Sequence, residues 1–555
     1  MSETALEARE PSARYLVNTQ SALLRGFELL ATAQGSIRNL RHLILELAIQ
    51  GKLVSQSTQD GPASTVVEDI QAAKGLTASP KRLVATSAGR LTDLPRGWCW
   101  SSLNEIGLIS PRNQADDSTI VSFVQMSSVP AAMMQPHLVE ARPWRDIKTG
   151  FTHFAEGDVG VAKITPCFEN GKSTVFRRLD NGIGAGTTEL HVVRPLGGVV
   201  PEYVLVFLKS PAFLRNGEAV MTGSAGQKRL PRAYFESTPF PLPPLAEQHR
   251  IVARVEELMK LCDALEQSGR LADEQHARLT STLFDALAAS ESAHALAENW
   301  QRVAEHFDLL LDRPEAIGDF DKTILQLAVS GCLIPQRSDD ATSPSTAEAA
   351  SSPEFPFGVP SNWRWTTLGE LCALVTSGSR SWKDYYSTEG SIFIRSQDIK
   401  ADRLEFDNRA FVKLPPTAEG LRTQVRRHDL LITITGANVG KAAVLNEALE
   451  DAYVSQHVAL VCLHEPQMAV FIHLWLVNAY GGRKLLLGSS YGAKPGLNLK
   501  NIKDLPVPLP PLAEQHRIVA RVEALRRLCA DLRQRLTQAR ETQSRLADAL
   551  VAEVA

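Results

Sequence analysis

The sequence lacks most of the features that mark membrane proteins, metalloproteins and strongly basic proteins. Its seven cysteines, spread over 555 residues, form no C-x-x-C pair and no spacing typical of a metal site. No apolar run reaches about 18 residues, and the N-terminus MSETALEARE carries acidic residues where a secretory signal needs basic ones. The formal net charge of −3 excludes a general excess of positive charge. We therefore expect a cytoplasmic protein with reduced thiols, no bound metal and no contact with a membrane.

The motifs of common nucleotide-dependent enzymes are also missing. The segment ENGKS ends like a phosphate-binding loop, but Pro166 stands where that motif needs glycine. GANVGKA has one residue too few between its glycines, and Ala442 replaces the required serine or threonine. GIGAGT fails the dinucleotide-binding pattern because its last position is Thr187. We therefore predict no catalytic residue and no cofactor, and we expect that the chain by itself is not an enzyme.

What the sequence does contain is an internal repeat. The phrase PLPPLAEQHRIVARVE occurs at 241–256 and again, unchanged, at 508–523. Two further pairs of phrases are similar: LILELAIQGKLVSQ at 43–56 with TILQLAVSGCLIPQ at 323–336, and LPRGWCWSSLNEIG at 94–107 with VPSNWRWTTLGELC at 359–372. The segments enclosed by these phrases have nearly equal lengths and very different letters. A repeat of this kind predicts two copies of one architecture that carry different inserts.

The repeated phrase predicts the start of a long helix. Pro244 and Pro511 suit a helix start, and Glu247 and Glu514 in the first turn suit the helix dipole. Apolar residues follow in alternating steps of four and three: Ile518, Val522, Leu525, Cys529, Leu532, Leu536, Ala539, Leu546 and Leu550 in the second copy, and Ile251, Val255, Leu258, Cys262 and Leu265 in the first. This heptad pattern favours an intramolecular antiparallel coiled coil. A helix packed on its own domain is the alternative.

The inserts have the pattern of α/β domains. DVGVAKITP and TTELHVVRP in the first insert, and DLLITITG and SQHVALVCL in the second, predict strands at corresponding places. The segments 203–216 and 471–487 are typical of helices. The W-x-W phrases at 98–100 and 363–365 predict an edge strand packed on each core, with stacking on a nucleic-acid base as an alternative role for one tryptophan.

The fold class that follows is α+β: two pseudo-symmetric α/β domains joined by long helices that form an antiparallel coiled coil. The predicted segments are an N-terminal helical segment (15–56), a linker (57–93) with a short helix near 66–74, the first domain (94–240), a long helix (241–290), a central helical segment (291–336), a linker (337–358), the second domain (359–507) and a second long helix (508–553).

Several phrases, taken in order, resemble the specificity (S) subunits of type I DNA restriction–modification systems. In the first half these are the W-x-W opening, DVGVAKITPCFENGKS, TTELHVVRP, the G-x-x-G-Q-K stretch and PLPPLAEQHRIV; in the second half they are IRSQDI, LLITITGANVGKAAV, SQHVAL and GLNLKNIKDLPVPLPPLAEQ. The resemblance implies two target-recognition domains, each reading one half of a split double-stranded DNA site. It also implies helices that bind two methyltransferase (M) subunits, with motor-nuclease (R) subunits in the full complex. The methyl-transfer signature N-P-P-[YF] of M subunits is absent. A related coiled-coil scaffold or decoy that reads no sequence is the alternative.

Charge in the inserts is nearly balanced, so DNA contacts must come from local clusters. Residues 98–240 contain 14 Lys and Arg against 13 Asp and Glu, and residues 363–507 contain 17 against 14. Arg and Lys suit guanine, and Asn and Gln suit adenine, in the major groove. The candidate DNA-binding residues in the first insert are Lys163, Thr165, Asn170, Lys172, Gln227, Lys228 and Arg229. Those in the second insert are Arg395, Ser396, Gln397, Thr435, Asn438, Lys441, Gln456, His457, Lys494 and Asn498. A structural role is the alternative for Gln456 and His457.

The polar residues of the repeated phrase are candidates for binding partner subunits, because the phrase is duplicated without change. They are Gln248, His249, Arg250, Arg254, Gln515, His516, Arg517 and Arg521. An exposed helix face without a partner is the alternative for each.

Overall fold

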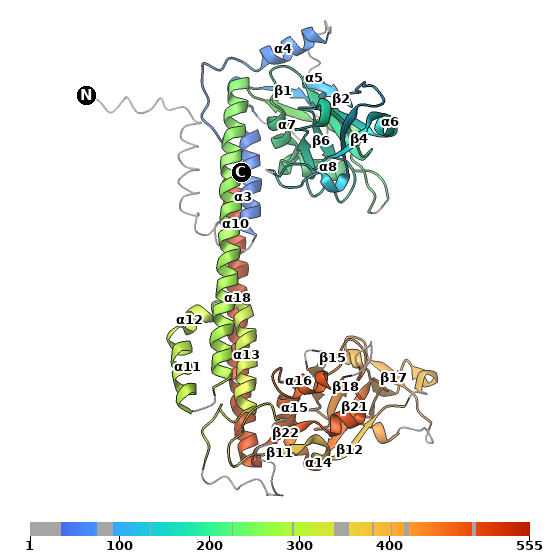
Figure 1. Cartoon of the computed structure of the whole chain (residues 1–555), viewed down its shortest axis with the longest axis vertical. Helices are drawn as coiled ribbons and strands as arrows, with labels where there is room; N and C mark the ends of the chain where they lie inside the picture. Colours follow the sequence, from blue (N-terminus) through green and yellow to red (C-terminus); the bar gives the residue numbers. More distant parts are fainter. Residues whose placement is uncertain are drawn as a thin grey trace, which may run out of the picture. The chain divides into compact units, whose positions relative to one another are not determined.

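The computed structural model describes residues 35–74, 93–133, 135–224, 226–290, 293–337, 355–379, 382–400, 402–415, 421–490 and 496–554. They form two compact units: unit 1 belongs to Met1–Ala272 and Arg540–Ala555, and unit 2 to Asp273–Ala539 (Figure 1). Two long helices, α10 (Leu245–Ala288) and α18 (Leu512–Val554), each contribute to both units. Each unit thus contains the start of one long helix and the end of the other, which agrees with the predicted antiparallel pair.

Unit 1 contains a domain of two four-stranded sheets and a ribbon. The first sheet is antiparallel, in the order β2 (Gly107–Ile109), β9 (Leu190–Pro195), β6 (Val159–Ala162) and β7 (Ser173–Val175). The second has the order β4 (Glu140–Pro143), β3 (Ile120–Val124), β8 (Ile183–Gly186) and β5 (Thr152–Ala155), with β3 and β8 parallel. The ribbon pairs β1 (Cys99–Ser102) with β10 (Pro239–Leu242). The chain therefore enters and leaves the domain on adjacent strands.

Unit 2 repeats the order of the antiparallel sheet and of three strands of the mixed sheet, whose fourth strand lies on the opposite edge. Its antiparallel sheet has the order β12 (Cys372–Ser377), β21 (Val458–Leu463), β18 (Leu430–Thr433) and β19 (Ala442–Val444). Its mixed sheet has the order β13 (Tyr386–Ser387), β17 (Ala410–Val412), β14 (Ser391–Ile394) and β20 (Ala452–Val454), with β14 and β20 parallel. Two antiparallel pairs complete the unit: β11 (Arg364–Thr367) with β22 (Pro506–Leu509), and β15 (Ile399–Lys400) with β16 (Arg403–Leu404). The predicted pseudo-symmetric α/β domains are confirmed.

Most helices of unit 1 have a counterpart at the equivalent place in unit 2. Those of unit 1 are α3 (Ser36–Ile49), α4 (Ser64–Ala73), α5 (Leu103–Ile106), α6 (Trp144–Ile147), α7 (Pro201–Leu208), α8 (Pro211–Val220) and α9 (Arg232–Ser237). Those of unit 2 are α11 (Ala293–Glu305), α12 (Phe307–Leu310), α13 (Pro314–Val329), α14 (Leu368–Leu371), α15 (Ala469–Val477), α16 (Gly482–Gly488) and α17 (Leu499–Lys503). The short 3-10 turns are η1 (Met126–Ser128), η2 (Asp180–Gly182), η3 (Trp382–Tyr385), η4 (Ser396–Asp398), η5 (Leu421–Thr423) and η6 (Pro466–Met468). The short helix expected near 66–74 is α4. Residues 15–34 and much of both predicted linkers lie outside the described residues.

Each of the two helical segments predicted after the strands is a pair of helices. In unit 1 the break falls between α7 and α8, where the hydroxyl of Ser210 accepts a hydrogen bond from the backbone N of Phe213 (3.3 Å). Pro211 then occupies the first turn of the new helix, where its missing N–H costs nothing. In unit 2 the segment divides into α15 and α16.

The tryptophans of the W-x-W phrases support the cores. Trp98 and Trp363 are buried. Trp98 packs edge-on against Tyr203 and Trp363 packs edge-on against Phe471. These contacts favour the expected structural role and place neither ring where it could stack on a base.

The identical phrase forms the joint between the ribbon and the long helix. Gln248 is fully buried: its Oε1 accepts a hydrogen bond from the backbone N of Val200 (2.8 Å), and its Nε2 donates to the carbonyl of Pro243 (3.0 Å). In unit 2 the Nε2 of Gln515 donates to the carbonyl of Pro510 (2.9 Å). Both side chains are used inside their own unit. The proposed partner role of Gln248 and Gln515 is therefore replaced by a structural one, because a partner cannot reach them.

The two expectations for the long helices, packing on their own domain and packing on each other, concern different parts of the helices. Ile251 and Val255, in the first turns of α10, belong to the same buried cluster as Trp98, so the helix start packs on its own domain. Farther along, Phe284 of α10 and Cys529 of α18 share one buried cluster in unit 2. Both long helices therefore contribute to one core in unit 2, which is compatible with the predicted antiparallel pair.

The predicted seam is wrong over the last turns of α18. Ala539 and Leu546 are exposed, whereas Ala547 is buried and Val551 packs against α3. A straight helix drifts by about 20° for each heptad, so its buried face moves away from a strict seven-residue repeat. From Leu536, which is partly buried in unit 2, to Ala547 the interval is eleven residues, about three helical turns, so the two residues lie on nearly the same face.

A short helix packs on a long helix in each unit, with opposite charges (Figure 1). In unit 1, the Arg41 guanidinium on α3 pairs with Asp263 and Glu266 of α10, at 2.6 Å in both cases. Asp321 of α13 occupies the position equivalent to Arg41 and pairs with Arg526 of α18 at 2.8 Å. Because the pair is reversed, each short helix matches the charge of its own long helix.

Candidate nucleic-acid interface

Four loops meet at one edge of the β-sheet domain in unit 1, and we call this surface loop edge 1. They are residues 125–128 after β3, 163–172 between β6 and β7, 187–189 between β8 and β9, and the described residues 222–224 and 226–230 after α8. The contacts that join them are the backbone N of Thr187 to the carbonyl of Val124 (3.4 Å), N of Lys163 to the carbonyl of Glu189 (2.9 Å), N of Thr165 to the carbonyl of Lys228 (3.0 Å), and Nζ of Lys172 to the carbonyl of Met126 (3.0 Å).

Loop edge 2, in unit 2, is built in the same way. It consists of residues 395–398 after β14, 434–441 between β18 and β19, 455–457 between β20 and β21, and the described part, 496–498, of the loop after α16. Its contacts are N of Ser455 to the carbonyl of Ile394 (2.8 Å), N of Ile434 to the carbonyl of His457 (3.0 Å), N of Leu497 to the carbonyl of Ile434 (2.9 Å), and Nδ2 of Asn438 to the carbonyl of Ser396 (3.2 Å). The backbone frame is shared, whereas the side chains differ.

All seven candidates of the first insert lie on loop edge 1. Asn170, Gln227 and Lys228 are exposed and free to meet a ligand. Arg229 pairs with Glu189 at 2.8 Å, and this hydrogen-bonded pair lowers the pKa of the Glu189 carboxyl. The remaining three are partly or fully buried: Lys163, Thr165 and Lys172. Thr165 accepts a hydrogen bond from the backbone N of Lys228 (3.1 Å), so its hydroxyl holds two loops together.

Most candidates of the second insert lie on loop edge 2. They are Arg395, Ser396, Gln397, Thr435, Asn438, Lys441, Gln456 and His457. Arg395 is held by the buried Asp398, with Nε to Oδ2 at 3.1 Å and Nη2 to Oδ1 at 2.9 Å. Asn498 also lies on loop edge 2, where its side chain caps α17, because its Oδ1 accepts from the backbone N of Asn501 (2.8 Å). Lys494 lies outside the described residues.

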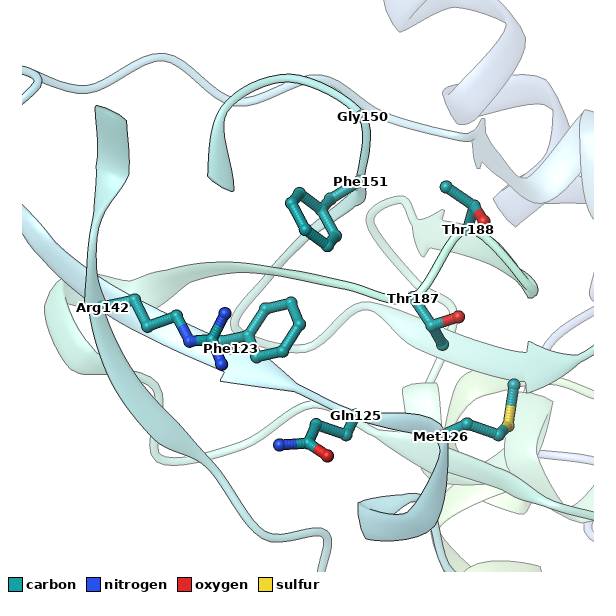
Figure 2. Close-up of a pocket in the computed structure, with 8 residues that line it drawn as sticks. All are labelled: Phe123, Gln125, Met126, Arg142, Gly150, Phe151, Thr187 and Thr188. Atoms are coloured by element: carbon teal, nitrogen blue, oxygen red, sulfur yellow. The ribbon is translucent and has the colours of Figure 1, made fainter. Parts of the chain in front are cut away.

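Loop edge 1 also contains a hollow that the sequence did not indicate. It measures about 450 Å³ (Figure 2), and its lining residues are Phe123, Gln125, Met126, Arg142, Gly150, Phe151, Thr187 and Thr188. The signal that could have found it is the match of SFVQMSSV with IFIRSQDI, which places Gln125 at the position of Arg395. The two phrases share few letters, and only the strand pairing makes the match plain.

The glycine-rich segments that resemble nucleotide-binding motifs do not form phosphate-binding loops. A phosphate-binding loop leads into a helix, whose first N–H groups hold the anion. ENGKS leads into β7 and GANVGKA leads into β19, while the residues IGAG form β8 itself. Among the described residues there is also no group of three or more His, Cys, Asp or Glu placed to hold a metal ion. No helix in the described part of the chain is both long and apolar enough to cross a bilayer.

The polar residues of the repeated phrase have several different environments. His249, Arg254, His516 and Arg521 are exposed on the long helices. Arg250 is tied to Asp60 by an ion pair of 2.5 Å. Arg517 also makes contacts within the chain.

An exposed leucine follows the repeated phrase on each long helix. Leu261 and Leu528 occupy equivalent positions, seven residues after Arg254 and Arg521, and both are more than half exposed. Residues seven apart lie on one helix face. The chain therefore presents two matching stripes, each with an arginine and a leucine.

Comparison with known proteins agrees with this architecture. The sequence profile described as the type I restriction modification DNA specificity domain matches residues 186–273 and 360–540. The chain is 35% identical to the EcoAI specificity subunit and 36% identical to the EcoEI specificity subunit, both type I restriction enzyme subunits of Escherichia coli, with 93% of each chain covered. A solved structure described as the basis of complex assembly and conformational transition of the type I R-M system has a similar fold, with a TM-score of 0.52. That likeness covers 84% of this chain and 99% of the other, at 21% identity.

Two domains of similar topology, each with a polar loop edge, define a protein that presents two different recognition surfaces on one frame. The extent of the identity to curated relatives then decides the family. The chain belongs to the specificity subunits of type I restriction–modification enzymes.

Proposed function

We propose that each recognition domain reads one half of a split double-stranded DNA site through its loop edge. The observation that carries this proposal is the pairing of an equivalent backbone frame with different side chains at loop edges 1 and 2. Phosphate contacts position a protein on DNA, and contacts to base edges specify the sequence. Two domains with equivalent loop backbones and different side chains suit a DNA site whose two halves differ in sequence.

The subunit itself is non-catalytic, and two methyltransferase subunits supply the methyl transfer. Motor-nuclease subunits then complete the restriction enzyme, which acts on DNA in the cytoplasm. The matching stripes of Arg254 with Leu261, and Arg521 with Leu528, are the surfaces for the methyltransferase subunits, because two equivalent partners need two equivalent surfaces. A leucine more than half exposed at both places gives each partner an apolar contact.

Replacing one insert tests the division of labour. In a complex reconstituted with its methyltransferase subunits, residues 98–240 are exchanged for the equivalent insert of a relative, and bound sites are selected from a random DNA library. We expect one half of the selected site to change and the other to stay. Exchanging residues 363–507 is the matched control and should change the opposite half.

Two outcomes would count against the proposal. If either exchange alters both halves together, the domains do not read independently. If the unmodified complex selects no sequence at all, the chain is the scaffold or decoy that reads no DNA.

A further inference from the structure

The strand registers show which residues of the two domains are equivalent. In the parallel pair β3–β8, Phe123 lies opposite Ala185, and in the parallel pair β14–β20, Phe393 lies opposite Tyr453. Each inner strand ends one residue later and leads into a 3-10 turn, η1 or η4. The residue between strand and turn is Gln125 in unit 1 and Arg395 in unit 2. A glutamine and an arginine therefore occupy the same place on the two loop edges.

Around this place each domain has a carboxylate that orients an arginine. In unit 1, Glu140 on β4 accepts from Nε (3.1 Å) and Nη2 (2.9 Å) of Arg142, and also from Nε2 of Gln125 (3.3 Å). In unit 2, Asp398 holds Arg395, and the amide of Gln397 lies 3.2 Å from the same guanidinium. Both loop edges thus combine an arginine, a carboxylate and an amide, taken from different positions in the chain.

The hollow on loop edge 1 surrounds this cluster in unit 1. The guanidinium of Arg142 stacks on the ring of Phe123, 4.1 Å from its centroid, and the edge of Phe151 meets that ring at 5.3 Å. Figure 2 shows these three side chains on one side of the hollow, with Thr187 and Thr188 across from them. The walls of the hollow therefore present aromatic rings on one side and threonine hydroxyl groups on the other.

The charge of the hollow suits a base better than a phosphate. The ion pair with Glu140 balances the charge of Arg142, and its hydrogen bonds lower the pKa of the Glu140 carboxyl, so the carboxylate stays ionised. The other polar groups that line the hollow, an amide and two hydroxyls, can donate and accept hydrogen bonds. A base edge displays both donors and acceptors, whereas a phosphate only accepts.

We propose that this hollow reads a base of the half-site bound by unit 1, with Gln125 as the side chain that contacts the base edge. The inference rests on the proposed function and deepens it. Thr187 and Thr188 form the opposite wall. Glu140 and Arg142 are positioning residues that fix the Gln125 amide.

The test measures base preference at every position of the site for the complete complex with methyltransferase subunits. With Gln125→Ala, discrimination at one position of the unit 1 half-site should fall by about 5- to 150-fold, the range of a good base contact. The other half-site should not change. Gln114→Ala is the matched control, because Gln114 is exposed in the loop that leads into the opposite end of β3. This variant should keep the wild-type base preference at every position of the site.

Glu140→Gln tests the positioning role. It should broaden preference at the same position as Gln125→Ala, and broadening elsewhere would overturn the shared hollow. Thr188→Ala, at an exposed residue, gives an independent probe if Gln125→Ala lowers the yield of folded protein.

The inference is overturned if Gln125→Ala and Thr188→Ala discriminate as the wild type does at every position. A loss spread evenly over all sequences would also overturn it, because that is the result for a phosphate contact. In both cases the wild-type complex still selects its site, so the proposed function stands. Failure of that function would appear as a wild-type complex with no preference.

Discussion

At the scale of single residues, a buried lysine holds loop edge 1 in place. Lys209 lies at the break between α7 and α8 with its ammonium inside the domain. Its Nζ donates to the carbonyls of Ala131 (2.8 Å), Gly171 (2.9 Å) and, at 3.4 Å, Pro130. Gly171 belongs to one of the loops of the edge, so this contact fixes the loop to the helices behind it. Burial lowers the pKa of Lys209 to about 7.

Lys209→Met should destabilise the protein in a pH-dependent way. Removing the donor leaves buried carbonyls unpaired, and we expect a loss of about 1–3 kcal/mol in the free energy of unfolding. Between about pH 7, the folded pKa, and 10.5, the ordinary value, the unfolded chain binds one proton more than the folded chain. Wild-type stability should therefore rise with pH in this window relative to the variant, by up to about 1.4 kcal/mol per pH unit.

Urea unfolding followed by tryptophan fluorescence at several pH values gives this difference. Lys148→Met is the control, because Lys148 is exposed and its ammonium pairs with Asp117 on the surface. A difference between wild type and Lys209→Met that stays constant from pH 7 to pH 9 would contradict the pH dependence.

The sequence predicted the site residues only in part, for a physical reason. Arg395 and Gln397 stood out because polar letters cluster there, and the structure places them on loop edge 2. Gln125 stands alone after an apolar strand, and Arg142 lies on a neighbouring strand, so their proximity depends on the pairing of β3 with β4. Pairing between distant strands leaves no local signal. Asn498 also has a structural role that the sequence did not indicate, because its Oδ1 caps α17.

At the scale of elements, the reversed ion pairs direct each short helix to its long helix. The α3 position Arg41 meets acidic residues on α10, whereas the equivalent Asp321 of α13 meets Arg526 on α18. Docking α13 on the acidic stretch of α10 would place like charges together, and such repulsion is a common source of specificity. The pairs therefore favour the observed partners over the exchanged ones.

Charge reversal tests this role. Asp321→Arg should lower the free energy of unfolding by about 1–3 kcal/mol, because two guanidinium groups then face each other in a partly buried place. The double variant Asp321→Arg, Arg526→Asp restores the pair and should recover most of the loss.

Reversing an exposed pair on the same helix is the matched control. Lys322 and Asp319 pair on the surface of α13, and Lys322→Asp should change stability by less than about 1 kcal/mol. If the double variant is as unstable as the sum of its single changes, the pair does not contribute as a pair.

Element types followed from the sequence more reliably than their ends did. Strands such as β6, β9, β18 and β21 lie where alternation and apolar runs predicted them. The helix seam failed at Leu546 because a strict heptad pattern assumes a left-handed supercoil, whereas the buried face near the end of α18 has shifted to Ala547. Sequence periodicity predicts the average direction of the buried helix face, and tertiary packing determines which residues are buried in the last turns.

At the scale of the whole molecule, the long helices are the described segments that contribute to both units. In unit 1 Asp263 of α10 pairs with Arg41 of α3, and in unit 2 Asp273 of α10 pairs with Arg313, the residue before α13. The α10 residues between Asp263 and Asp273 are mostly exposed. In α18 the corresponding stretch follows Leu536 and precedes Ala547. If these helices hold the recognition domains at a fixed separation, their length sets the distance between the half-sites.

Shortening both helices by one heptad tests that idea. Deleting 266–272 and 537–543 keeps the domain cores, whereas deletions that include Val255 or Val522 would remove buried core residues. The loss is about 10 Å at about 1.5 Å per residue. One DNA turn of about 34–36 Å contains about 10–10.5 base pairs, so the spacer should shorten by about three base pairs. The domains would also turn by about a third of a turn around the duplex, so specific binding is lost if they cannot adjust.

Selection from a library of half-sites with random spacers measures the preferred distance. Limited proteolysis shows whether each unit is still folded. Replacing the same residues with a helix-forming sequence of equal length is the matched control, and it should keep the original spacer because length alone is preserved. A folded deletion variant that prefers the original spacer would show that the helices do not set the distance, and the spacing would then have to come from the domains or from the partner subunits.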